Sequence, residues 1–278
     1  MSYKIIVDSC CELPEMYHQD KRFQIIPLGL EVGDYQIMDD KNFNQAEFLA
    51  QVALCPVCPK SSCPSPEKYM EAYRADVDNI FVVTLSSHLS GSYNSAVLGK
   101  NLYHEQYGTK NIYVFDSESA SSGETQYALK MMELQEKGAS FEETIQELET
   151  FRDEMKTYFI LDNLETLRKN GRLTGVKAMV VSTLNIKPIM FGNHGVIEQK
   201  SQAIGMKKAL SKLADIMVKE VGNMESRTLM ISHCNCPDRA EFMKRELLAR
   251  TKVKDIIVMD TAGVSSMYAN DGGIVVTI

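Results

Sequence analysis

The sequence lacks the features of a membrane-spanning or exported protein. No apolar run in the 278 residues approaches the roughly 20 residues that a membrane-spanning helix needs. The first residues lead directly into a strand-like segment at 3–7, without the basic and apolar regions of a signal peptide. We therefore expect a soluble, cytoplasmic protein.

Motifs for phosphate binding and for nucleophilic hydrolysis are also missing. No GxGxxG follows the first strand-like segment, and no glycine-rich loop ends in the lysine of a P-loop. A nucleotide polyphosphate is therefore disfavoured as ligand. No GxSxG marks a nucleophile elbow, and His88, His194 and His233 remain the candidate bases of a serine hydrolase. A histidine in a loop is more often a surface or packing residue, so we expect no catalytic residues.

The chain has no excess of positive charge. Its 30 basic and 37 acidic residues give a net charge of -7. Such a chain has no general attraction to phosphate backbones or to anionic membranes. Nucleic acid is therefore not expected as a partner.

Seven cysteines are an odd number for a disulfide framework, and free thiols are expected instead. Cys55, Cys58 and Cys63 lie close enough in sequence to suggest a metal site, but a zinc site usually needs a second ligand pair. The segment 233–236 is the sole candidate for that pair. Three interspersed prolines explain the segment equally well as a rigid loop. We expect no metal, and a redox role of the three thiols stays open.

Short apolar runs alternate with helix-like segments in the first half, which is typical of a parallel α/β fold. Buried strands are expected at 3–7, 79–85 and 111–115. Helices are expected at 44–54, 66–76, 91–106, 120–137 and 140–156. The expected N-caps are Ser90, Ser119 and Ser140.

The second half has a different rhythm and predicts a smaller lobe with a mixed sheet. Its strands are expected at 157–161, 187–200 (two strands joined by a hairpin turn at 192–195), 228–233 and 255–259, with a last apolar segment at 272–278. Its helices are expected before 170, at 176–184, at 206–221 and at 238–250. We place the division at 1–160 and 161–278, although no flexible linker marks it.

Small hydroxyl side chains follow the predicted parallel strands, at the edge where ligands bind in such sheets. The sharpest example is the segment 85–96, where a strand turns through serines into a helix. Ser90 and the backbone N–H groups after it could face an anion. The alternative is an ordinary serine cap, with Gly91 for tight packing. Hydroxyls and amides with few cations suit a single weak anion, such as a carboxylate.

Seven short motifs occur in a fixed order along nearly the whole chain. They are Val7-Asp8-Ser9, Pro59 to Pro66, Leu85 to Ala96, Val114 to Ser117, Leu164 to Arg172, Lys187-Pro188-Ile189 and Gly272-Gly273. Their order and spacing resemble the DegV family of bacterial fatty-acid-binding proteins. The resemblance implies a three-layer α/β/α lobe with a parallel sheet, a smaller two-layer lobe with a mixed sheet, and an acyl chain between or within them.

The same resemblance implies a ligand site. A long-chain fatty acid such as palmitate would be bound through its carboxylate by hydroxyls that map to Ser61 and Ser90, beside Gly91. The near alternatives are Ser62 and Ser87. The family commonly has Thr at the position of Ser61, and Tyr268 stands where some members have a His near the carboxylate. No cofactor is implied.

A partner is implied as well. Better understood members are non-catalytic carriers that present the acid to a separate, dihydroxyacetone-kinase-like fatty acid kinase, and such a carrier would contact a membrane transiently. Ile204 replaces an Arg of the proposed kinase-facing surface, whereas Arg172 and Lys207 are candidate docking residues or merely solvated charges. The alternatives are an enzyme or sensor that binds a small anion in the same crevice, and a protein-interaction module without a ligand.

Overall fold

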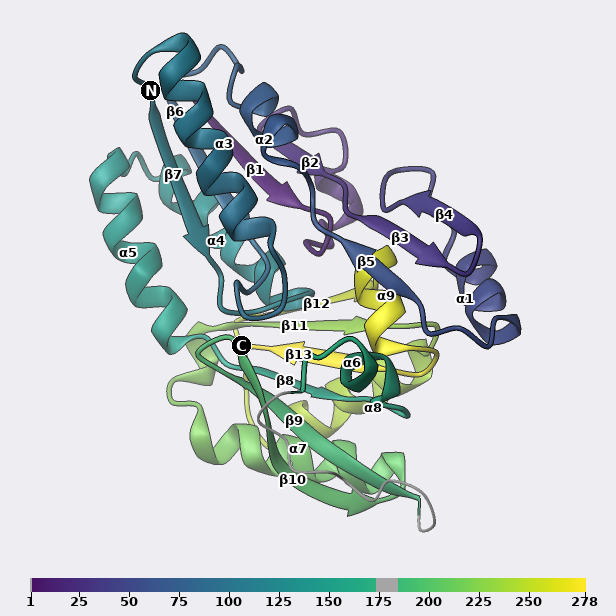
Figure 1. Ribbon diagram of the computed structural model, residues 1–278. Helices are drawn as coiled ribbons and strands as arrows, with labels where there is room; N and C mark the ends of the chain where they lie inside the picture. Colours follow the sequence, from purple (N-terminus) through teal and green to yellow (C-terminus); the bar gives the residue numbers. More distant parts are fainter. Residues whose placement is uncertain (1, 174–184) are drawn as a thin grey trace.

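The computed structural model describes residues 2–173 and 185–278. The helix expected at 176–184 lies outside the described residues. Two large sheets are stacked one above the other, with the N-terminal half of the chain forming most of the upper lobe (Figure 1).

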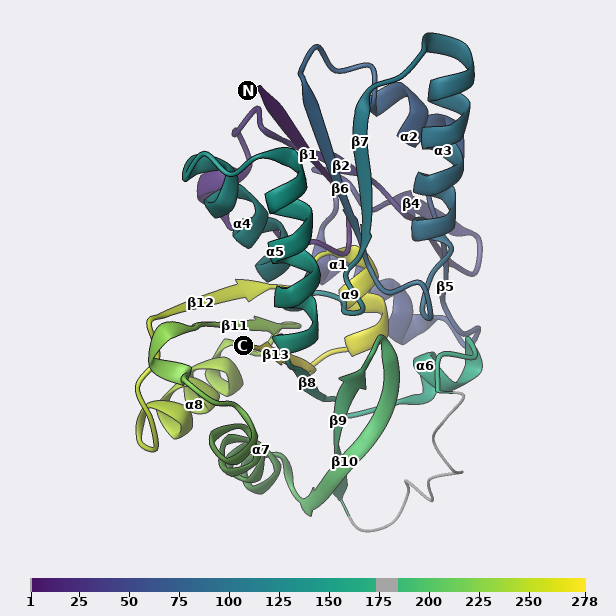
Figure 2. The same ribbon diagram turned by 90° about the vertical axis from the view of Figure 1, so that its left-hand side faces the viewer.

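The upper lobe is built on a parallel sheet of order β2-β1-β6-β7. Its strands are β1 (Tyr3–Asp8), β2 (Phe23–Ile26), β6 (Asn79–Thr84) and β7 (Asn111–Asp116), and its helices are α2 (Pro66–Ala72), α3 (Ser92–Tyr107), α4 (Ser122–Glu136) and α5 (Phe141–Glu154). Successive strand residues point to opposite faces. Ile5 and Phe81 therefore pack with α4 and α5, whereas Ile6 and Val82 pack with α2 and α3. Figure 2 shows these helix pairs on opposite sides of the sheet, as a three-layer α/β/α lobe.

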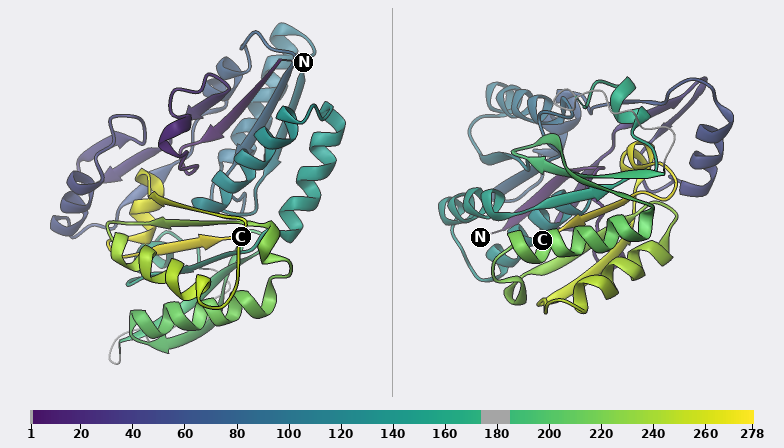
Figure 3. Two further views of the ribbon diagram at one scale, coloured as in Figure 1. Left: turned by 180° about the vertical axis from the view of Figure 1, so that it is seen from behind. Right: turned by 90° about the horizontal axis from the view of Figure 1, so that it is seen from below.

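The lower lobe is built on a mixed sheet of order β10-β9-β8-β13-β11-β12. Its strands are β8 (Thr157–Ile160), β9 (Ile186–Asn193), β10 (Val196–Ile204), β11 (Thr228–His233), β12 (Asp255–Asp260) and β13 (Ile274–Thr277). Helices α7 (Met206–Glu220) and α8 (Pro237–Leu248) cover its outer face, as Figure 3 shows from below. Leu213 and Met243 join that face to Ile231. The opposite face looks toward the upper lobe.

A third, antiparallel sheet of order β4-β3-β5 was not predicted. Its strands are β3 (Gly29–Val32), β4 (Tyr35–Met38) and β5 (Lys60–Ser62), and the remaining helices are η1 (Glu15–Tyr17), α1 (Gln45–Leu54), α6 (Glu165–Lys169), η2 (Met224–Ser226) and α9 (Gly263–Ala269). Leu30 on β3, Phe48 on α1 and Met267 on α9 share one buried cluster. The small sheet thereby holds α9 between the two lobes.

The predicted fold class, both large sheets and the β9–β10 hairpin are confirmed. Ser140 caps α5 as expected, through a capping box with Glu143. The other two caps are wrong, because α3 begins after Gly91 and α4 after Ser121. The hydroxyl of Ser90 instead accepts a hydrogen bond from the N–H of Ser92 within the preceding turn. The division near residue 160 stays a prediction; β8, which ends there, belongs to the mixed sheet.

Among the described residues, no helix is both long and apolar enough to cross a bilayer. Over the same residues, no group of three or more His, Cys, Asp or Glu is placed to hold a metal ion. All seven cysteines lie within the described ranges and are free thiols.

Candidate functional site

An apolar cavity, which we call the tunnel, lies between the two lobes. It measures about 110 Å³. Pockets for small organic ligands usually measure about 300–1,000 Å³. A long ligand therefore needs the walls of the tunnel to move apart.

The floor of the tunnel is the inner face of the mixed sheet. Phe159 lines it and is paired with Val275 on β13, which lines it too. Farther along the same sheet, Ile197 on β10 is paired with Gly192 on β9, and both residues line the tunnel. Cross-strand partners point to the same face of a sheet. The strand register therefore produces this apolar surface.

The roof consists of loops that follow the parallel strands, together with α9. Cys10, Leu85 and Ala120 lie shortly after β1, β6 and β7. Val264 and Tyr268 come from α9. Because the carboxyl ends of parallel strands meet at one edge, these distant segments converge over the floor.

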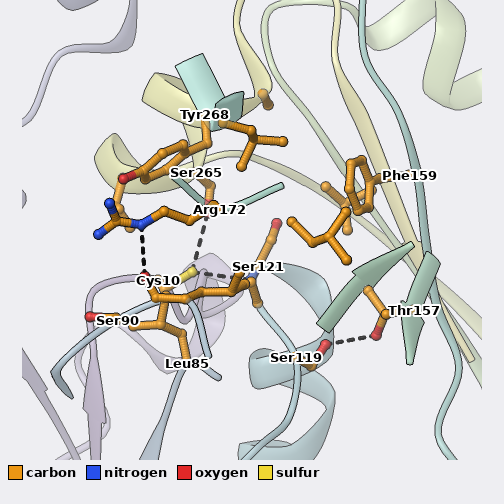
Figure 4. A pocket seen from close by; sticks show the side chains of 18 of the residues that line it. Cys10, Leu85, Ser90, Ser119, Ser121, Thr157, Phe159, Arg172, Ser265 and Tyr268 are labelled. Carbon is orange, nitrogen blue, oxygen red and sulfur yellow. Dashed lines mark hydrogen bonds between the residues drawn. The ribbon is translucent and has the colours of Figure 1, made fainter. Parts of the chain in front are cut away.

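We call one extremity the Arg172 end, defined by Ser61, Ser90, Arg172 and Tyr268. Figure 4 labels the last three of these residues. The hydroxyls of Ser61 and Tyr268 lie 3.1 Å apart. Arg172 Nε donates to the carbonyl of Leu89 at 3.0 Å, and Nη1 donates to the carbonyl of Asn170. These bonds fix the guanidinium beside the serine segment.

We call the other extremity the Thr157 end, defined by Glu118, Ser119, Thr157, Gly192 and Gly195. The hydroxyls of Ser119 and Thr157 are 2.7 Å apart, on the far side of the tunnel from Arg172 in Figure 4. The carboxylate of Glu118 forms an ion pair with Arg152 and accepts from a histidine at the hairpin turn. This end therefore carries hydroxyls and an ion-paired carboxylate.

A buried polar network lies behind the middle of the tunnel wall. Glu12 Oε2 accepts from the hydroxyls of Ser121 at 2.7 Å and Ser232 at 2.8 Å, and so joins the two lobes. Burial raises the pKa of Glu12 to about 7, although the surrounding serine hydroxyls oppose the shift. Ser121 and Ser265 belong both to this network and to the tunnel wall.

The structure brings three of the predicted ligand residues to the tunnel: Ser61, Ser90 and Tyr268. Three others lie off its wall. Ser62 follows Ser61 on β5, so its side chain takes the opposite face, where its hydroxyl lies beside Gly29. Ser87 uses its N–H to bind Asp116, and Gly91 adjoins the thiol of Cys63. The assignment of individual ligand contacts stays a prediction.

Several tunnel residues were not predicted from the sequence. Arg172 was considered only for docking, yet it lines the tunnel. Thr157 lies on an expected strand, and alternation with buried Tyr158 could have placed it on the inner face. Ser265 could not be predicted from the local sequence, because the position of its helix α9 depends on the distant residue Asp39. The carboxylate of Asp39 accepts hydrogen bonds from the N–H groups of Gly263 and Val264 at 2.7 and 2.8 Å.

Comparisons with known proteins agree with this architecture. A family model described as "Uncharacterised protein, DegV family" matches residues 2–278. A DegV domain-containing protein of Streptococcus pyogenes serotype M1 is 33% identical over 279 residues, covering 99% of this chain and 98% of the relative.

Two solved structures are similar over the whole chain. A DegV family protein from Ruminococcus gnavus, refined with vaccenic acid, is 52% identical with a TM-score of 0.97, and the match covers 100% of both chains. The Streptococcus pneumoniae Fatty Acid Kinase (Fak) B3 protein, loaded with linoleic acid, is 31% identical with a TM-score of 0.90, and the match covers 100% of this chain and 99% of the other.

Proposed function

This chain belongs to the DegV family, and on that premise we propose that it binds one long-chain fatty acid in the tunnel, with the carboxylate at the Arg172 end. The observation that carries the proposal is an apolar tunnel with a guanidinium and hydroxyls gathered at one extremity. The related R. gnavus and S. pneumoniae proteins hold vaccenic and linoleic acid.

The charges of the two ends support this orientation. Arg172 is a cation with spare N–H donors, which suits a carboxylate. At the Thr157 end, Arg152 is already ion-paired with Glu118 and so is not free to bind one. A carboxylate loses its hydration on entering, so hydroxyls such as Ser61 must replace the lost hydrogen bonds.

The hydrophobic effect supplies the affinity. A chain of about fourteen methylenes at roughly 0.8 kcal/mol each offers on the order of 11 kcal/mol when it is fully buried. A small anion would leave Phe159, Ile197 and Leu85 without a partner. The tunnel therefore favours a lipid over a small-anion ligand.

We further propose that the chain is a non-catalytic carrier, which presents its bound acid to a separate fatty acid kinase. The likeness to the Fatty Acid Kinase (Fak) B3 protein supports this partner. Arg172 and Tyr268 would hold the carboxylate, and Lys207 at the exposed start of α7 is a candidate for docking.

The test is to denature the purified protein, extract it and identify acyl species by mass spectrometry. We expect fatty acid in near-stoichiometric amount, and a higher melting temperature after addition of palmitate or oleate. Acetate and inorganic phosphate serve as matched small-anion probes and should change nothing. Protein that carries no acid and binds neither palmitate nor oleate would contradict the proposal.

A further inference from the structure

We propose that the Thr157 end is an adjustable stop that sets the length of acyl chain this protein accepts, with Gly192 and the Ser119–Thr157 hydroxyl pair as its determinants. This inference rests on the proposed function, which places the carboxylate at the Arg172 end and the methyl end of the chain here. It goes further by assigning chain-length specificity to named residues.

Gly192 lines the tunnel floor without contributing a side chain. Its cross-strand partner Ile197 lines the tunnel, so a side chain at position 192 would point into the tunnel as well. The register Tyr158↔Phe191, continued by one residue, brings Thr157 opposite Gly192 on β8. A Cβ at position 192 would lie in ordinary van der Waals contact, at 3.9 Å, with Thr157 Cβ and with the carbonyl oxygen of Glu118. The position therefore has room for a Cβ, and the further carbons of a larger side chain would take up space in the tunnel.

The hydroxyl pair closes this end of the tunnel. Ser119 comes from the loop after β7 in the upper lobe, whereas Thr157 begins β8 in the lower lobe. Their hydrogen bond of 2.7 Å joins the lobes across the tunnel. A methyl group offers no replacement hydrogen bond, so a tail that separated the pair would leave polar groups unsatisfied. The pair therefore stops an alkyl chain.

The stop is thin. Glu118, Thr157 and Gly192 also line a second cavity on the far side, whose walls carry Arg152 and Lys200. These two cations are ion-paired, with Glu118 and Glu220 respectively. An alkyl tail gains nothing in that polar cavity. The length of acyl chain that the tunnel accepts is consequently limited by the Ser119–Thr157 pair and by the space over Gly192.

Two substitutions should shift the length preference in opposite directions. Gly192→Val adds a side chain that favours β-strands. The φ angle of Gly192 is not positive, so the backbone can accept valine. Thr157→Val keeps the shape of the side chain but removes the hydrogen bond that closes the end. Gly222→Val is the matched control, since Gly222 has open space around it and lies outside the tunnel.

The experiment loads each delipidated variant with an equimolar mixture of palmitate, stearate, arachidate and behenate, and measures the bound acids by mass spectrometry. For each variant we compare the bound amounts of two acids: palmitate, and the longest acid that the wild type binds. Gly192→Val should lower the ratio of the longer acid to palmitate by about tenfold, because room for one to two methylenes is lost. Thr157→Val should raise the share of the next longer acid by about threefold. Melting curves confirm that each variant is folded, and Gly192→Ala is a milder substitute if Val unfolds the chain.

The outcomes separate the two proposals. A wild type that retains no acid contradicts the proposed function and this inference with it. If the wild type retains acid but Gly192→Val and Thr157→Val bind the same distribution of chain lengths as the Gly222→Val control, this inference alone is overturned. A uniform loss of all four acids in Gly192→Val would likewise overturn it, since a stop affects long chains more than short ones.

Discussion

The hydroxyl oxygens of Ser61 and Tyr268 lie 3.1 Å apart at the Arg172 end of the tunnel, although 207 positions separate the two residues in the sequence. One belongs to the small antiparallel sheet and the other to α9. Each hydroxyl in such a pair keeps further hydrogen-bonding capacity. The pair can therefore receive a carboxylate without rearrangement of the backbone.

We predict that Ser61→Ala, Ser90→Ala and Tyr268→Phe each weaken fatty acid binding. A hydrogen bond to a charged group contributes about 1.5–3 kcal/mol, so affinity for palmitate should fall about tenfold to a hundredfold. Titration calorimetry measures the change, and Ser62→Ala is the matched control because Ser62 points away from the tunnel. Wild-type affinity in all three variants would place the carboxylate elsewhere.

Replacing the cation should have a charge-specific effect. Arg172→Gln keeps hydrogen-bonding capacity but removes the positive charge, so palmitate should bind at least about tenfold more weakly. The corresponding fatty alcohol carries no charge and should lose much less. Displacement of a fluorescent fatty acid compares the two ligands. An equal loss for acid and alcohol would show that Arg172 acts only on the shape of the tunnel.

Strands buried on both faces were the most predictable part of this fold. The segment Thr228–His233 was predicted to the residue, because it has an apolar centre at 229–231 with polar residues on both sides. The strands Gly29–Val32 and Tyr35–Met38 were missed because each has only four residues, which is too short for alternation to be distinctive. The intervening Gly33-Asp34 pair is a hairpin signal that could have revealed them.

The tunnel could be predicted only in part. The serine segment after β6 indicated a binding edge, because strand ends in a parallel sheet define it. The position of α9 depends on Asp39, which caps this helix from more than two hundred residues away. No local pattern reports such a tertiary contact. The sequence therefore indicated where ligands could bind but not which elements enclose them.

Loss of the Asp39 cap should affect both stability and binding. Asp39→Asn keeps one acceptor oxygen and loses the charge, so one of the two hydrogen bonds to the start of α9 weakens. We expect the free energy of unfolding to fall by about 1–2 kcal/mol. Palmitate affinity should fall as well, because Val264 and Tyr268 lie on α9. Asp40→Asn is the control. Urea unfolding with unchanged midpoint would contradict the prediction.

Glu12 should make the fold less stable as the pH rises. Burial raises its pKa from 4.5 to about 7 in the folded chain, so the folded state holds a proton that the unfolded state has lost. Stability is therefore greatest below pH 4.5 for this group and declines until about pH 7, by on the order of 3 kcal/mol. Glu12→Gln cannot ionise and should flatten that part of the profile. Urea unfolding at several pH values measures it, and identical profiles would refute the role.

The carrier role makes a prediction about catalysis. Alone, the protein should neither hydrolyse acyl esters nor consume ATP, since it has no nucleophile elbow and no phosphate-binding loop. With a fatty acid kinase from the same organism, ATP and palmitate, we expect acyl phosphate and ADP in equal amounts. At saturating palmitate, Lys207→Ala should slow this reaction if α7 contacts the kinase, whereas Lys244→Ala on α8 should not.

Ile204 offers a second test of the same surface, because it is 62% exposed at the end of β10. Ile204→Arg introduces the cation that the family resemblance implies for the kinase-facing surface, and should so lower the concentration of binding protein at half-maximal rate by a few fold. This decrease in the half-maximal concentration should vanish at high salt, since exposed charges are screened there. Acyl phosphate formed without any kinase would overturn the carrier role. Failure with every kinase tried, while palmitate still binds, would favour a lipid store or sensor.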